Sequence, residues 1–399
     1  MRYLLLLVFA AMVLGCASTT HTVHPAEKKP MSPNAVSHPV PYKEGIEKSL
    51  KMAGENRSEI EKFLKDAGGG FRKTAAYFLV AHMPPAALAS LTAEELLSEF
   101  NLAFKAREEF PWGKKVSDEM FLHFVLPNFI TQECYQRYRA YLYPLLKEAL
   151  KGCKTMEEAA LELNRWCGAR FTYKHTQVRD QGVFENLKRG YGRCEEMMIL
   201  YMAAARTVCL PVRHAYTPLW STCDSNHAWV EVWCDGKWCY LGACEPAARL
   251  NEAWFTEPAK RAPLVLAVVF GRTERLEEGE EIYDAMERET VINTTKWYSD
   301  TARVKVKVTD GGKPVADKLV LFYVFNFGGL RPFAKAKTNK EGVAAITLGM
   351  GEFFVSSGDD KRFAIAKVKT EPNKEVLLEL KIGEQKLEEG FFWLRYPSK

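Results

Sequence analysis

The residue best suited to nucleophilic chemistry is Cys194, which follows the glycine-containing segment Gly190–Arg193. Apolar residues recur at helical spacing from residue 195 to residue 208, so the pattern predicts a helix that begins at the cysteine. The first amide groups of a helix lack intrahelical partners and carry partial positive charge. This position is expected to lower the pKa of the thiol and to offer donors for an oxyanion. For an isolated cysteine, a core or disulfide role would be commoner.

A general base for this thiol is available on the strands that follow. Leu210–Pro211 ends the helix, residues 212–217 are predicted to form a strand, and His227 opens a second strand. Asp235–Gly236 is a preferred two-residue hairpin loop, so residues 237–244 are expected to return as the partner strand. Five histidines lie outside the N-terminal tail: His82, His123, His175, His214 and His227. The hairpin would hold His227 most rigidly, and a nucleophile at a helix start can work with a base on a following strand.

Four short motifs surround these two residues: Gly192–Glu196, Leu210–Arg213, His227–Val232, and Trp238 with Glu245–Pro246. Together they resemble the transglutaminase-like superfamily of papain-like folds, which includes transglutaminases, peptide N-glycanases and bacterial thiol proteases. The resemblance covers roughly residues 155–250, and the stretch after the histidine is similar to peptide N-glycanases. It implies Cys194 as the nucleophile and His227 as the base.

The third catalytic position departs from the family pattern. The family places an aspartate four residues after the tryptophan of the return strand, where this chain has Gly242. If the loop at 235–236 is flanked directly by paired residues, Trp229 lies opposite Gly242 and His227 opposite Cys244. Opposed residues share a face of the sheet. A side chain at position 242 would therefore lie on the face of His227, but glycine offers none.

Three arrangements stay open for the third position. Glu245 could orient His227 if a β-bulge turns its side chain inward. Alternatively, Cys194 and His227 act as a dyad, with a backbone carbonyl, Asn226 or Asp224 holding the ring. In the third arrangement the site is inactive. Loss of the acid from a catalytic triad can cost on the order of 10⁴ in rate, so a dyad would be slow but real.

Four tryptophans lie near the proposed site: Trp220, Trp229, Trp233 and Trp238. Such side chains could stack on a sugar or hold a peptide. Trp229 and Trp238 are expected to pack mainly in the core, with Trp229 a weaker candidate for substrate contact. Trp220 lies in the predicted loop between the two strands and is the best candidate for substrate binding.

The N-terminus has the features of an export signal. Arg2 precedes the apolar run Leu4–Leu14, which is too short to span a bilayer, and residues 1–15 are predicted to be a signal peptide. Val13–Cys16 resembles a bacterial lipobox, which implies acylation of Cys16. We expect a lipid anchor in the cell envelope, in the outer membrane because no aspartate follows the cysteine. The proline-rich residues 16–44 are expected to form a disordered tether.

The remaining chain divides into three parts. Apolar spacing predicts a helical region over residues 45–154, with a capping box at Thr92–Glu95, and part of it resembles a region found in lipoprotein members of the family. Residues 155–298 are the expected papain-like core. From residue 299 to residue 399 the period changes to two, with turn signals between short strands, which predicts an antiparallel β-sandwich. This part resembles carboxypeptidase-regulatory and transthyretin-like modules. The fold class is therefore predicted to be α+β.

Composition excludes several other classes of function. The 399 residues include 55 Lys and Arg and 50 Asp and Glu. This near balance lacks the excess of positive charge that indicates nucleic-acid binding. No dinucleotide, phosphate-loop or zinc motif is found, so neither a cofactor nor a metal is expected. Of the ten cysteines, Cys16 is assigned to lipid and nine remain. An odd number leaves at least one free thiol, and the pairing of the others stays open.

The sequence thus favours an exported thiol hydrolase or acyltransferase whose substrate is a protein, peptide or glycopeptide. Cys194 would attack a carbonyl carbon, His227 would protonate the leaving amine, and water or a second amine would resolve the acyl-enzyme. The alternative is a catalytically inactive binding or scaffold protein that recognises a peptide or glycan at the cell surface. Gly242 is the best argument for this alternative.

Overall fold

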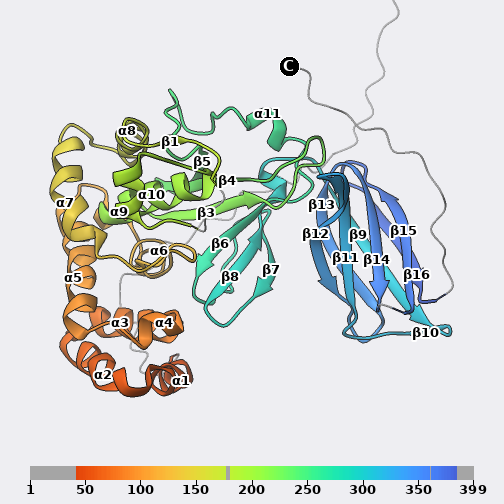
Figure 1. Cartoon of the computed structure of the whole chain (residues 1–399), viewed down its shortest axis with the longest axis horizontal. Coiled ribbons are helices and arrows are strands. Elements are labelled where there is room, and N and C mark those ends of the chain that lie inside the picture. Colours follow the sequence, from red (N-terminus) through yellow and green to blue (C-terminus); the bar gives the residue numbers. More distant parts are fainter. Residues whose placement is uncertain (1–41, 177–179, 360, 384–399) are drawn as a thin grey trace, which may run out of the picture. The chain divides into compact units, whose positions relative to one another are not determined.

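A computed structural model describes residues 42–176, 180–359 and 361–383 (Figure 1). The expected signal peptide, Cys16 and nearly all of the expected tether lie outside the described residues. Helices precede a six-stranded sheet, and two four-stranded sheets follow it. This mixture of helices and largely antiparallel sheets confirms the predicted α+β class. Within the described ranges, every helix is too short or too polar to cross a bilayer.

The first part of the described chain is helical. Its α-helices are α1 Lys43–Ala53, α2 Arg57–Asp66, α3 Phe71–His82, α4 Pro85–Leu88, α5 Ala93–Glu109, α6 Asp118–Phe124, α7 Tyr138–Ala149 and α8 Met156–Gly168. The predicted capping box is present at the start of α5, where the Glu95 N–H donates to the Thr92 hydroxyl at 3.3 Å. Thr155 and Glu158 form a second capping box at the start of α8.

A buried helix and a six-stranded antiparallel sheet form the next part. The elements are β1 Thr172–Tyr173, α9 Val183–Arg189, β2 Tyr191–Gly192, α10 Cys194–Thr207, β3 Val212–Thr217, β4 His227–Cys234, β5 Lys237–Leu241, α11 Thr256–Ala259, β6 Leu266–Phe270, β7 Glu281–Ala285 and β8 Glu289–Asn293. The strand order is β5-β4-β3-β6-β8-β7. Helix α10 contacts β3 and β4, and it is buried from Glu196 to Thr207. The sheet and the helices α7, α8 and α9, which also contact α10, therefore enclose it along almost its whole length.

The hairpin of β4 and β5 has the predicted register. Cys234 pairs with Lys237 and Val230 with Leu241, as the Asp–Gly loop requires. The expectation that the return strand continues to Cys244 is wrong, because pairing ends at Leu241. The chain turns instead: the Glu245 N–H donates to the Gly242 carbonyl at 3.1 Å, and Cys244 has a left-handed φ of 57°.

A buried ion-pair network joins β3, β4 and the loop before β7. The Arg213 guanidinium donates to Glu231 at 2.6 Å and to Glu280 at 2.7 Å, and all three side chains are at most 2% exposed. The Tyr298 hydroxyl donates to the second oxygen of Glu231 at 2.6 Å, and accepts a hydrogen bond from the Trp229 indole at 3.0 Å. Both carboxylate oxygens of Glu231 therefore accept hydrogen bonds within the fold, and its role is structural.

The last part consists of strands β9 Thr301–Asp310, β10 Lys313–Pro314, β11 Leu319–Asn326, β12 Gly329–Lys337, β13 Val343–Gly349, β14 Glu352–Gly358, β15 Phe363–Lys369 and β16 Glu375–Lys381. One sheet contains β10, β9, β13 and β16, and the other has the order β12-β11-β14-β15. Alternate residues of β9, such as Val304 and Val306, are fully buried, as the period of two predicted. One pair differs from the expected antiparallel pattern, since β16 runs parallel to β9.

Candidate active site

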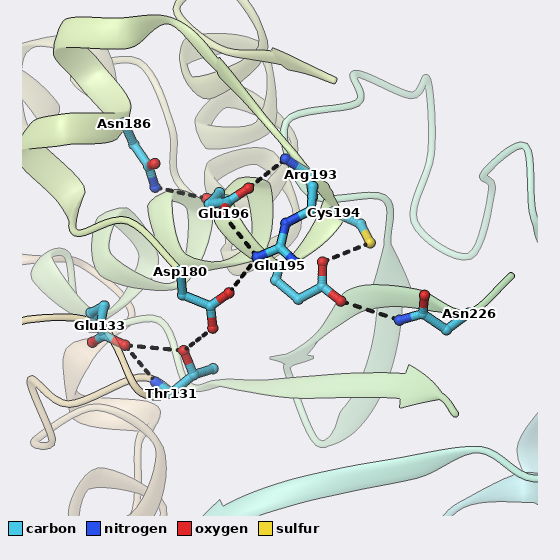
Figure 2. Close-up of polar contacts among 9 residues, drawn as sticks. All are labelled: Thr131, Glu133, Asp180, Asn186, Arg193, Cys194, Glu195, Glu196 and Asn226. Carbon is cyan, nitrogen blue, oxygen red and sulfur yellow. Dashed lines mark hydrogen bonds and ion pairs between the residues drawn. The ribbon is translucent and has the colours of Figure 1, made fainter. Parts of the chain in front are cut away.

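A polar network fixes the start of α10, where Cys194 is the first helical residue. The Glu196 carboxylate accepts hydrogen bonds from the backbone N–H of Arg193 at 2.5 Å and from its guanidinium at 3.0 Å. The same guanidinium donates to Asp180 at 2.8 Å, and Asp180 in turn accepts from the Thr131 hydroxyl at 3.1 Å (Figure 2). The backbone that carries the sulfur is therefore held by side chains from several segments.

The Cys194 sulfur lies against the start of β4. Its thiol donates to Glu195 Oε2 at 3.2 Å, and Glu195 Oε1 accepts from the Asn226 side chain at 3.2 Å (Figure 2). The backbone N–H of Ala228 also lies near the sulfur, where it lowers the pKa of the thiol. The structure therefore places the sulfur beside the residue that directly follows His227.

The resting thiol is neutral, contrary to the expectation from its place at a helix start. Burial raises the pKa of Cys194 to about 12, and the negative charge of Glu195 acts in the same direction. The N–H groups of Ala228 and Glu195 lower the pKa, but they do not outweigh these two effects. The Glu195 carboxylate, next to the cysteine in the chain, opposes the effect of the helix end on the thiol pKa.

His227 is the first residue of β4 and is only 7% exposed. Its ring packs against Trp254 at 4.7 Å, Phe255 at 4.9 Å and Trp229 at 5.7 Å between ring centroids. Burial lowers the pKa of His227 to about 4, so the imidazole is neutral and able to accept a proton. Its Nε2 is buried and, among the described residues, has no hydrogen-bond partner.

The second histidine near the site, His214, lies on the other face of the sheet. His214 pairs with Val230 and Thr217 pairs with His227, so alternation along the strands separates the two rings. The His214 ring stacks on Tyr216 at 4.9 Å, and burial lowers its pKa to about 4 as well. From the sequence alone, the His214 side chain could lie on either face of the strand.

The Glu245 carboxylate fills the space beside Gly242. A Cβ atom at position 242 would lie 2.1 Å from Glu245 Oε2, so a side chain there and the observed Glu245 conformation exclude each other. Burial raises the pKa of Glu245, and the Trp254 indole donates to its Oε1 at 3.1 Å. Its Oε2 is buried and without a partner in the described part of the chain. A turn, and not the β-bulge considered from the sequence, sets the direction of the Glu245 side chain.

The carboxylate and the imidazole are linked only through Trp254. No carboxylate within the described ranges forms a hydrogen bond or ion pair with His227; instead, the Trp254 ring touches His227 while its N–H binds Glu245. The two other side chains considered for holding the ring are engaged elsewhere. Asn226 binds Glu195, and Asp224 accepts from the Phe327 N–H at 2.7 Å.

One exposed aromatic at the site is Trp254, which was not predicted from the sequence. Trp220, the predicted substrate contact, is 3% exposed, and Trp229 is fully buried, so neither presents a ring to solvent. Trp254 is 60% exposed and lies against His227. It occurs outside every recognised motif, in a segment without periodicity, so its spacing gave no signal. No group of three metal-ligating side chains occurs among the residues described.

A charge-removing substitution tests how Glu195 controls the thiol. In Glu195→Gln, the carboxylate no longer disfavours the thiolate, so the pKa of Cys194 should fall. We expect alkylation of Cys194 by iodoacetamide at pH 8 to accelerate at least about tenfold, since one pKa unit is a factor of ten in thiolate. The rate is measured by mass spectrometry of the Cys194 peptide across pH 6–10. An unchanged profile would show that burial alone sets this pKa.

Comparison with known proteins supports the assignment of this region. A family model for the transglutaminase-like superfamily matches residues 144–243, and no curated protein matches the chain. A candidate cysteine protease from Cytophaga hutchinsonii shares 12% identity over 61% of this chain and 56% of its own, with a TM-score of 0.26. Red sea bream transglutaminase shares 9% identity over 69% of this chain and 58% of its own, with a TM-score of 0.25. The chain thus spans a little over half the length of each structure. The similarity to the transglutaminase-like superfamily therefore rests on residues 144–243, which the family model matches.

Proposed function

We propose that this chain is a cysteine enzyme that acts on amide bonds of a protein, peptide or glycopeptide through Cys194 and His227. One observation carries the proposal: the N–H of Ala228 lies close enough to the Cys194 sulfur, at the start of a buried helix, to lower the pKa of that thiol. The next residue back along the strand is His227, whose imidazole is neutral. The transglutaminase-like domain supports the same chemistry.

The proposed reaction begins when the thiol leaves its hydrogen bond with Glu195. His227 then accepts the thiol proton, and the sulfur attacks the substrate carbonyl carbon to form a tetrahedral adduct. The amides at the start of α10 lack helical partners and are available to stabilise the oxyanion. His227 returns the proton to the departing amine, which leaves an acyl group on Cys194. Water or a second amine then releases this acyl group, giving hydrolysis or transfer.

Hydroxylamine trapping tests this proposal without knowledge of the natural substrate. The protein is incubated with dimethylated casein and with peptides from a bacterial envelope digest, with and without hydroxylamine. We expect acyl hydroxamates to form, and an acid-quenched sample without hydroxylamine to show acyl mass on the tryptic peptide Cys194–Arg206. Absence of both products, with the fold intact by circular dichroism, would contradict the proposal.

A binding protein without catalysis is the second candidate. The raised pKa of the Cys194 thiol favours it, as does the His227 Nε2, which has no partner in the part of the chain that the structure describes. Under this reading, Cys194→Ala would leave binding to a peptide or glycan array unchanged, and the trapping experiment would give no acyl adduct.

We propose in addition that the chain is exported and anchored in the cell envelope through an acylated Cys16. The signal-like residues 1–15 and the Val13–Cys16 motif support this location, and the residues concerned lie outside the described part of the chain. Labelled fatty acid should be incorporated into the full chain and lost in Cys16→Ser. Equal labelling of the two proteins would contradict the anchor.

A further inference from the structure

Two buried cysteines from distant parts of the chain meet behind the candidate active site. Cys167 lies in the last turn of α8, and Cys244 lies in the turn that carries Glu245. Their exposed fractions are 0% and 4%, and both are free thiols. The Cys167 thiol lies close enough to Cys244 to raise the pKa of its thiol, and the Cys244 thiol donates to the Met197 carbonyl at 3.3 Å.

The backbones that carry these thiols are also in close contact. The Asn164 side chain donates to the Gly242 carbonyl at 3.0 Å and to the Glu245 carbonyl at 2.8 Å, so one residue of α8 holds both ends of the turn. On the other side of Cys167, a Cβ atom at Gly168 would lie 2.9 Å from the Cys244 carbonyl oxygen. A disulfide requires this kind of close backbone approach.

The surroundings favour a covalent pair over the other roles of cysteine. Within the described residues, no third side chain joins the pair to form a metal-binding group. Burial raises the pKa of Cys244 well above its usual range, so it is not an activated nucleophile.

We propose that Cys167 and Cys244 form a disulfide when the chain folds under oxidising conditions. Each thiol loses its proton, the two sulfurs together give up two electrons, and one S–S bond forms. A low-molecular-weight disulfide such as oxidised glutathione accepts the electrons and is released as two thiols. The bond would fasten the end of α8 to the turn that carries Glu245.

Peptide mapping tests the pairing directly. The full chain is refolded with a mixture of oxidised and reduced glutathione, or with a reductant alone, then blocked with N-ethylmaleimide in denaturant and digested with trypsin. We expect peptides Trp166–Arg170 and Trp238–Arg249 to be linked in the oxidised sample, with a loss of two hydrogens, and to separate on reduction. Chain isolated from an oxidising compartment and blocked in the same way gives a second measurement that does not depend on refolding.

Three variants assign the bond, because Trp238–Arg249 also contains Cys239. The link should persist in Cys239→Ser and in the buried control Cys209→Ser, and disappear in Cys244→Ser. We also expect the oxidised wild type to melt at a temperature about 5 °C or more above that of the reduced wild type. Alkylation of both cysteines in folded, oxidised protein, or a link that survives in Cys244→Ser, would overturn the proposal. The readout is mass, so an oxidised but inactive protein would contradict only the proposed function.

Discussion

Replacing His227 by alanine is expected to lower the rate of hydroxamate formation by about 10³–10⁴, close to the loss caused by Cys194→Ala. In the proposed reaction the neutral imidazole takes the thiol proton, because burial raises the thiol pKa to about 12 and almost no thiolate forms otherwise. Because the two residues act as a unit, the double variant should be no slower than Cys194→Ala alone. Rates are measured with dimethylated casein and hydroxylamine.

His214→Ala provides the matched control. His214 is half-buried, has a pKa that burial likewise lowers to about 4, and lies on the opposite face of the sheet. Its replacement should change the rate by less than about threefold in protein that remains folded. If His214→Ala removed activity while His227→Ala kept it, the assignment of the base would be reversed.

The pH profile gives a second measure of the same base. His227 must be neutral to accept the thiol proton, so activity should rise with pH as the imidazole loses its proton and then level off. Since burial lowers the pKa of His227 to about 4, the acid limb should lie near pH 4. A limb near pH 6.5, the usual value for histidine, would indicate that the catalytic imidazole is exposed to solvent.

Local features of the fold could be predicted because they depend on neighbouring residues. The Asp–Gly loop leaves little freedom in how its flanking strands pair, so the register from Cys234–Lys237 to Val230–Leu241 followed from the loop alone. The capping box at Thr92–Glu95 depends on residues three apart. The place of Cys194 at the first position of α10 followed from helical spacing.

Features that depend on distant segments could not be predicted in this way. The return strand ends at Leu241 because Asn164, from α8, holds the carbonyls of Gly242 and Glu245. Trp220 is buried, and its carbonyl accepts a hydrogen bond at 3.0 Å from Asn326, which lies more than a hundred residues away. The thiol pKa depends first on burial and then on the conformation of Glu195, and no periodicity reveals either of them.

Removing the Glu245 carboxylate is the second substitution with a large expected effect. Glu245→Ala should lower the rate of hydroxamate formation by about 10² or more, because the acid that supports the base in a triad can contribute up to about 10⁴. Productive geometry requires Oε2 of Glu245 and Nε2 of His227 to meet, and each is a buried atom that lacks a partner among residues 42–176, 180–359 and 361–383. Glu252→Ala, in the same loop and paired with Arg249 at the surface, is the control that should leave the rate unchanged.

A double-mutant cycle at Gly242 and Glu245 tests the same prediction. Gly242→Asp alone should not raise the rate, because its Cβ would lie 2.1 Å from Glu245 Oε2 and bring two carboxylates together. In Gly242→Asp/Glu245→Ala, the space that the Glu245 carboxylate fills beside position 242 is free. The new aspartate then occupies the position where the transglutaminase-like superfamily has one. We expect this double variant to recover at least about tenfold over Glu245→Ala, a non-additivity expected of two residues that compete for one space and serve one function.

The outcomes separate the three arrangements of the third position. Recovery in the double variant would mean that Glu245 supplies the acid from a new position in the chain and that Gly242 makes room for it. Full activity in Glu245→Ala would leave Cys194 and His227 as a dyad, with the ring held by its aromatic neighbours Trp254 and Phe255. An inactive wild type that gains activity only in Gly242→Asp/Glu245→Ala would identify a binding protein that has lost its acid but kept the remainder of the site.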